Sequence, residues 1–181
     1  MRQATTGLHG AWLLARGQPM GLAYLAPSSE VAGSFWAIPL SLPAFVALRA
    51  IDWAVAGVGD APGLVFLREM LALLIGWIGF LVLMHPLCRR MGLAERWPRF
   101  VIAWNWCSLL QALMAVVAAL TGLLGAPDWI VQTAGLVTAG WSMWLGWFVT
   151  RLTLGVTARI AAVIVMLDVA VELLASGFIV G

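Results

Sequence analysis

Long apolar runs dominate this chain and decide what it can fold into. A span of the bilayer core takes about 20 consecutive apolar residues in a helix, and inside the bilayer only helices and closed barrels satisfy their own backbone groups. With 63% hydrophobic and 10% charged residues, the composition excludes an ordinary soluble domain. We therefore expect an all-α, polytopic membrane helix bundle. Five transmembrane helices are predicted, at residues 31–58, 64–84, 100–124, 129–150 and 160–180.

The segment His85–Arg99 is the longest polar interruption between these runs, and it predicts the orientation. It carries four arginines against one acid, Glu95. Basic residues beside membrane spans stay in the cytoplasm. The loop should therefore be cytoplasmic, with the N-terminus cytoplasmic and the C-terminus extracytoplasmic. The residues that determine this topology are Arg89, Arg90, Arg96 and Arg99, and the same layout puts Arg2, Arg16, Arg151 and Arg159 in the cytoplasm.

Residues 1–30 form a cytoplasmic segment ahead of the transmembrane domain at residues 31–181. Apolar residues at helical spacing in this segment favour a short helix lying in the membrane interface, and a loosely ordered tail is the alternative. These residues are Leu8, Ala11, Trp12 and Ala15. In the first span, Pro39 and Pro43 each remove a backbone donor, which predicts a kinked helix.

Asp168 and Glu172 are the most informative polar residues, since both lie inside the fifth predicted span. They are four residues apart and share one face of the helix, about 12 and 18 Å from its inner end. Two acids at mid-membrane cost roughly 5–7 kcal/mol on the insertion scale. The apolar residues of the span return only about 4–7 kcal/mol on that scale. The helix therefore needs partners for its carboxylates, or needs them protonated.

Depth along the spans suggests those partners. Arg49 and Arg68 lie in the outer parts of the first two spans, where Glu172 is the better match for either arginine. Asp168 lies deeper, level with Gln111 of the third span. We predict an intramembrane polar cluster made of Asp168, Glu172, Gln111, Arg49 and Arg68.

Two interpretations of this cluster remain open. In the first, the acids form a proton or cation site of a small transporter or channel. In the second, the charges are paired and fix how the helices pack, without a further role. The sequence favours the second, because no further run of polar residues marks a continuous path through the membrane.

A stripe of tryptophans on the fourth span is the remaining candidate contact surface. Trp141, Trp144 and Trp147 are three residues apart, a spacing typical of one helix face. They are candidates for contact with a lipid, a pigment or a partner protein, or for anchoring at the interface. No metal or other cofactor is expected, because His85 and Cys88 alone do not make a metal site.

Two short stretches resemble a known group of proteins. Residues Gly10–Trp36, which include GAWLLARGQP and GLAYLAPSSEVAGSFWA, and the AWNW of Ala103–Trp106 resemble small inner-membrane proteins of alphaproteobacteria whose function is unknown. The five-span layout with a cytoplasmic N-terminus is also similar to that of the Yip1-type family. The first resemblance implies a bacterial inner membrane, and neither implies an activity.

These observations together predict a non-catalytic, multi-pass protein of the bacterial inner membrane. Its expected role is that of an accessory, assembly or structural subunit that contacts lipids and other membrane proteins or copies of itself. The alternative is a small proton- or cation-coupled transporter or channel protomer that uses Asp168 and Glu172. Nucleic acid is not an expected partner, since the arginines are spread over the ends of apolar runs.

Overall fold

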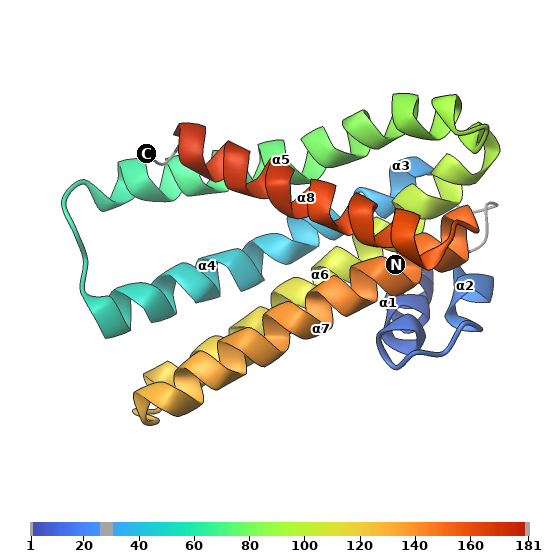
Figure 1. Ribbon diagram of the computed structural model, residues 1–181. Coiled ribbons are helices and arrows are strands. Elements are labelled where there is room, and N and C mark those ends of the chain that lie inside the picture. The colour runs from blue at the N-terminus through green and yellow to red at the C-terminus, as the bar shows by residue number, and fades with distance from the viewer. Residues whose placement is uncertain (1, 26–30, 180–181) are drawn as a thin grey trace.

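All regular elements that the computed structural model describes, over residues 2–25 and 31–179, are helices. Short N-terminal helices precede a set of long antiparallel ones (Figure 1). The short elements are α1 (Arg2–Ala15), α2 (Gly21–Tyr24), α3 (Val31–Ser34) and the 3-10 turn η1 (Ala94–Arg96). The long helices are α4 (Ala37–Ala56), α5 (Pro62–Arg90), α6 (Trp97–Leu123), α7 (Asp128–Leu154) and α8 (Ala158–Ile179).

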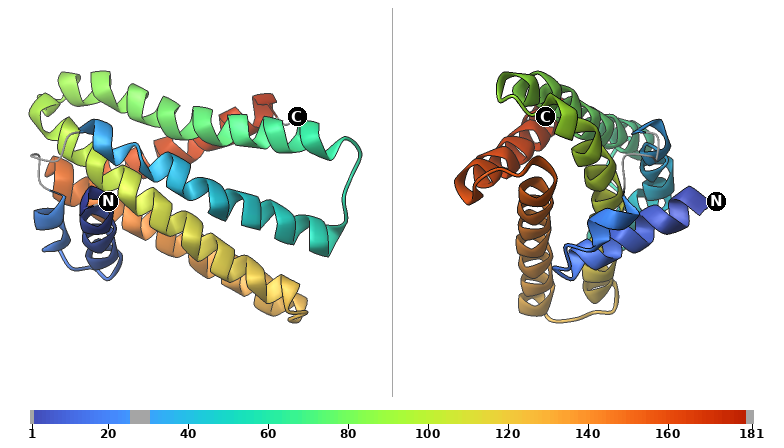
Figure 2. Two further views of the ribbon diagram at one scale, coloured as in Figure 1. Left: turned by 180° about the vertical axis from the view of Figure 1, so that it is seen from behind. Right: turned by 90° about the vertical axis from the view of Figure 1, so that its right-hand side faces the viewer.

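The long helices form an open ring. Helix α4 packs against α6, α6 against α7, α7 against α8, and α8 against α5. Helices α4 and α5 follow one another in the chain, yet their backbones diverge toward the loop that joins them (Figures 1 and 2). The ring is therefore closed by helix packing everywhere except between α4 and α5.

One end of the ring collects most of the arginines. Helices α5 and α7 end there, and η1, α6 and α8 begin there (Figure 1). We refer to it as the arginine end, defined by Arg89, Arg90, Arg96, Arg99, Arg151 and Arg159. The loop between α4 and α5 and the turn between α6 and α7 lie at the opposite end, where the exposed acids Asp60 and Asp128 are found.

Helix α1 runs across the ring near the arginine end instead of along it (Figure 2). Its buried face contains Gly7, Gly10, Ala11 and Leu14, while Leu8 and Trp12 are exposed. Gly7 faces the ring of Trp106 on α6, and Gly10 meets the backbone of Gly21 on α2. The side chains at these two positions have to be absent for α1 to pack this closely. The side chains of Leu8 and Trp12 therefore point away from the core that α1 joins.

The predicted kink in the first span appears as a break between α3 and α4 at Phe35 and Trp36. Pro39 falls in the first turn of α4, where its missing N–H would have no helical partner. Pro43 lies inside the helix. The break therefore comes before the prolines, and α4 continues through the second of them.

Four helical stretches of the described residues are long and apolar enough to cross a membrane, judged by length and composition. They are Val31–Ala56, Pro62–Arg90, Ala94–Leu123 and Ala158–Phe178. Helix α7 is not one of these four stretches, although it has 27 residues and lies antiparallel to α6. Gln132 and the many Thr, Gly and Trp residues of α7 lower its hydropathy. The second stretch extends past the predicted limit at Met84, since α5 continues through Pro86 to Arg90.

Candidate functional site

A cavity of about 580 Å³ lies inside the ring and is lined by all the long helices. This volume falls within the range of about 300–1,000 Å³ that is usual for small-molecule sites. We refer to it as the polar cavity. Its polar lining consists of Arg49 from α4, Glu69 from α5, Ser108 and Gln111 from α6, Ser142 from α7, and Asp168, Glu172 and Ser176 from α8.

Asp168 and Glu172 lie on the face of α8 that looks into this cavity. The Glu172 side chain packs beside Gly76 of α5, where an added Cβ would stand 3.5 Å from Cγ of Glu172. Because Gly76 has no side chain, the Glu172 side chain can lie against α5. Within the described part of the chain, neither Asp168 nor Glu172 forms an ion pair with an arginine.

Arg49 has other partners. Its Nη2 lies 2.6 Å from Oδ2 of Asp52, and its Nη1 donates a hydrogen bond to Oε1 of Glu69 at 2.8 Å. Glu172, which sequence depth suggested as the partner, is not bonded to it. The reason is geometric, because Asp52 is one helical turn from Arg49 and Glu69 faces it across the gap between α4 and α5.

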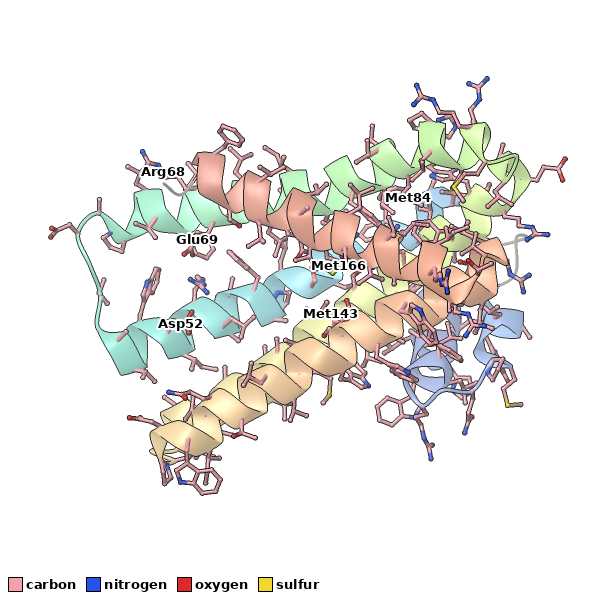
Figure 3. The ribbon with its side chains drawn as sticks, in the orientation of Figure 1. Asp52, Arg68, Glu69, Met84, Met143 and Met166 are labelled. Carbon is pink, nitrogen blue, oxygen red and sulfur yellow. The ribbon has the colours of Figure 1, made fainter. Side chains whose placement is uncertain are left out.

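Arg68 lies outside the polar cavity. Figure 3 shows Glu69 pointing toward α4 and Asp52, while Arg68 points away from them. Arg68 is exposed, and Glu69 has taken the inward position one residue along the helix. Gln111 does reach the cavity, and its Nε2 donates to the backbone oxygen of Ser142 on α7 at 3.0 Å. Of the predicted cluster, the structure brings together Asp168, Glu172, Gln111 and Arg49.

Two polar atoms at the edge of the cavity are buried without a hydrogen-bond partner. They are Nε of Arg49 and Oε2 of Glu69. Buried polar atoms are normally bonded, and an exception asks for an explanation such as a ligand. The free Glu69 oxygen adds a third acidic group to the cavity, against the single cation Arg49.

A separate hydrogen-bond chain fixes the wall of the cavity near Trp77. Trp77 Nε1 donates to Oδ1 of Asn105, and Nδ2 of Asn105 donates to Oγ of Ser34, both at 2.9 Å. Asn105 is fully buried, and these bonds satisfy both ends of its amide. The chain joins α3, α5 and α6, and only the three-dimensional arrangement makes it visible.

Apart from the loop that joins them, α4 and α5 are connected by side-chain contacts. The Arg49–Glu69 ion pair is one connection. Phe66 of α5 supplies another, since its ring centroid is 5.4 Å from that of Phe45 and 6.4 Å from that of Trp53. We refer to this set of contacts as the α4–α5 seam. It forms the one side of the cavity without close backbone packing in the described ring.

The arginines of the predicted cytoplasmic loop have varied contacts. Arg96 donates from Nη1 to the backbone oxygen of Leu154 at 2.6 Å, which satisfies a carbonyl at the C-terminus of α7. Gly155 follows with φ +65°, and a Cβ there would collide with Arg96. Arg89 and Arg90 are exposed in the last turn of α5. Arg99, in the first turn of α6, leaves its Nε without a partner.

The three tryptophans of the α7 stripe contact α1, the start of α8 and α7 itself. Trp141 Nε1 donates to the oxygen of Ala15 at 3.4 Å, and Trp147 Nε1 donates to the oxygen of Ala158 at 3.0 Å. Trp144 stacks on Phe148, with centroids 5.4 Å apart and planes at 9°. The stripe thus attaches α1 and α8 to α7, although Trp144 remains 38% exposed.

The chemistry of the polar cavity suits a positively charged guest. It holds three acids and one arginine, and the aromatic rings of Phe45, Trp77 and Trp104 complete its wall. Aromatic faces attract cations, especially where water is scarce. In the described residues, no group of three or more His, Cys, Asp or Glu is placed to hold a metal ion.

Comparison with protein-family models, curated proteins and solved structures found no match for this chain. The class of protein therefore rests on its own features, which are long apolar helices of membrane length around a polar cavity. They suggest a helical membrane protein. The resemblance of Gly10–Trp36 to alphaproteobacterial inner-membrane proteins stays a prediction.

Proposed function

We propose that this chain is a five-span protein of the bacterial inner membrane that carries a cation, coupled to protons, through the polar cavity. Helix α7 is the fourth span in chain order and completes the set of five. The arginine end faces the cytoplasm, because basic residues beside spans stay there. The antiparallel pairing of α7 with α6 along its length supports its membrane position.

One observation supports this function over a purely structural one. Asp168 and Glu172 line the cavity without an arginine partner, whereas Arg49 is already paired with Asp52 and Glu69. A carboxyl group inside a membrane is tolerated when it is protonated or beside a cation. A site whose carboxyl groups bind a proton and a cation in turn meets one of these two conditions at every stage. Arg49 and Glu69 are the other charged groups that face it.

Flux measurements in liposomes test this proposal. Purified protein is reconstituted with a pH-sensitive dye inside, and gradients of sodium, potassium, tetraethylammonium and dodecyltrimethylammonium are imposed in turn. We expect at least one cation to drive proton movement, and we expect Asp168→Asn with Glu172→Gln to abolish it. Asp60→Asn is the matched control, because it neutralises an exposed acid in the loop between α4 and α5. Equal fluxes in all three proteins would refute the proposal.

A role as an accessory or structural subunit is the second candidate, and the α4–α5 seam favours it. Both helices expose apolar side chains, among them Val46 of α4 and Leu71 of α5. Another membrane protein, or a second copy, would cover them. Extraction in mild detergent followed by mass determination tests this role. A fixed ratio of co-purifying protein supports it, and a lone monomer that carries cations excludes it.

A further inference from the structure

An apolar groove adjoins the polar cavity and extends from it toward the opposite end of the molecule. It has a volume of about 390 Å³ and lies between α6 and α7. Two residues, Ala115 and Ser142, line both the groove and the cavity. The groove wall is built mainly from small residues: Ala115, Ala118, Ala119, Gly135, Thr138, Ala139 and Ser142, with Val131 at its end.

The two spaces differ sharply in character although they share Ala115 and Ser142 in their walls. The acids Asp168, Glu172 and Glu69 belong to the cavity, and the groove contains no charged residue. Along α7 the groove extends from Val131 to Ser142, which is roughly 16 Å at 1.5 Å per residue. This is about the length of an extended dodecyl chain. Gly135 and Ala139 are exposed, so the groove is open along its side.

We propose that the cation is amphipathic, with its charged head in the polar cavity and its alkyl chain in the apolar groove. This inference rests on the proposed function and specifies its substrate class, which is a long-chain amine or quaternary ammonium ion. Charge complementarity assigns the head, since the cavity has an excess of acids and aromatic walls for an ammonium group. The shared wall at Ala115 and Ser142 puts the groove next to the cavity, and this position assigns the tail. A ligand of this kind reaches the acids from within the bilayer.

Carbodiimide labelling of the acids provides a direct readout. Protein in nanodiscs is treated with dicyclohexylcarbodiimide, and the adducts at Asp168 and Glu172 are quantified by mass spectrometry of peptides. The probes are dodecyltrimethylammonium and tetramethylammonium, which share a head group, with neutral dodecyl maltoside and anionic dodecyl sulfate as tail controls. We expect dodecyltrimethylammonium to protect the acids at a lower concentration than tetramethylammonium, and the other two amphiphiles to give no protection.

Two glycines of α7 supply matched variants, because a Cβ added at either meets nothing within 4 Å. Gly135 lines the groove, whereas Gly140 does not line it. Overpacking of a filled site costs enough to weaken binding by roughly tenfold or more. Gly135→Leu should therefore weaken protection by dodecyltrimethylammonium by about tenfold, with no change for tetramethylammonium. Gly140→Leu should behave as the unmodified protein, and partitioning into lipid is the same for both variants.

The outcomes separate this inference from the proposed function. If tetramethylammonium protects as well as the long-chain cation, or if Gly135→Leu has no effect, the amphipathic substrate is wrong and a cation site remains. If no cation protects the acids, or if carbodiimide does not label them at all, both proposals fail.

Discussion

The sharpest structural prediction concerns Asn105, whose side chain joins three helical segments inside the apolar interior. Replacing Asn105 by Ala removes the hydrogen bond from Trp77 and the one to Ser34. No water is at hand to replace these bonds, because Asn105 is 0% exposed. The variant should therefore fold but lose stability.

The size of the loss follows from the number of bonds. Hydrogen bonds between side chains of membrane helices contribute about 0.6 kcal/mol on average and up to about 1.7. Two of them give roughly 1–3 kcal/mol in the free energy of unfolding. At about 2–4 °C per kcal/mol for a chain of this length, the unfolding midpoint should fall by about 2–12 °C.

The native cysteines provide the assay. Cys88 and Cys107 are both buried, so a fluorogenic maleimide labels them only as the protein unfolds. Trp77→Phe and Ser34→Ala should each cost part of the Asn105→Ala effect, and Trp77→Phe should cost little more when Asn105 is already Ala. Leu113→Ala, at a side chain 42% exposed on the same helix, is the control. If Asn105→Ala unfolds at the same temperature as this control, the hydrogen-bond chain does not stabilise the fold.

Three further predictions follow from the backbone and the helix ends. Gly155→Ala should lower the unfolding midpoint more than Gly125→Ala, because both glycines follow a helix at similar positive φ but only at Gly155 would a Cβ displace the Arg96 guanidinium from the Leu154 oxygen; equal shifts would rule out a contribution from this displacement. Gly10→Val should separate α1 from α2, since even a Cβ at position 10 would stand 2.9 Å from the Gly21 oxygen, and limited proteolysis should then cut before α3. With five spans, tags at the two termini should be accessible from opposite sides of a sealed vesicle, and accessibility from one side would leave an even number of spans.

The helices were predictable from sequence because apolar runs and their Gly, Pro and charged boundaries are local signals. Hydropathy did not separate the end of a span from the end of a helix, so α5 runs to Arg90 instead of Met84. For the N-terminal segment, the sequence predicted a helix lying in the membrane interface, and Leu8 and Trp12 are exposed on α1. It did not predict the close packing of α1 through Gly7 and Gly10, because that packing depends on α2 and α6.

Part of the candidate site was also predictable, because depth along a helix follows from residue number. Depth places Asp168 and Gln111 at similar levels, and both line the polar cavity. Depth does not give direction around the helix axis. For that reason Arg68 was included although it points outward, and Glu69, one residue further along, was placed nearer the outer surface and left out of the cluster. The Trp77–Asn105–Ser34 chain depends on three segments meeting, which no single stretch of sequence encodes.

The α4–α5 seam has a mechanical consequence. At the arginine end, Arg96 donates a hydrogen bond to the end of α7 from the turn between α5 and α6. This bond links α7 to α5 and α6 at that end. At the far end, one ion pair and a few ring contacts hold α4 to α5. The distance between α4 and α5 at this end therefore depends on these few side-chain contacts. A cation in the cavity that binds Glu69 competes with Arg49 for this carboxylate and weakens the ion pair between α4 and α5.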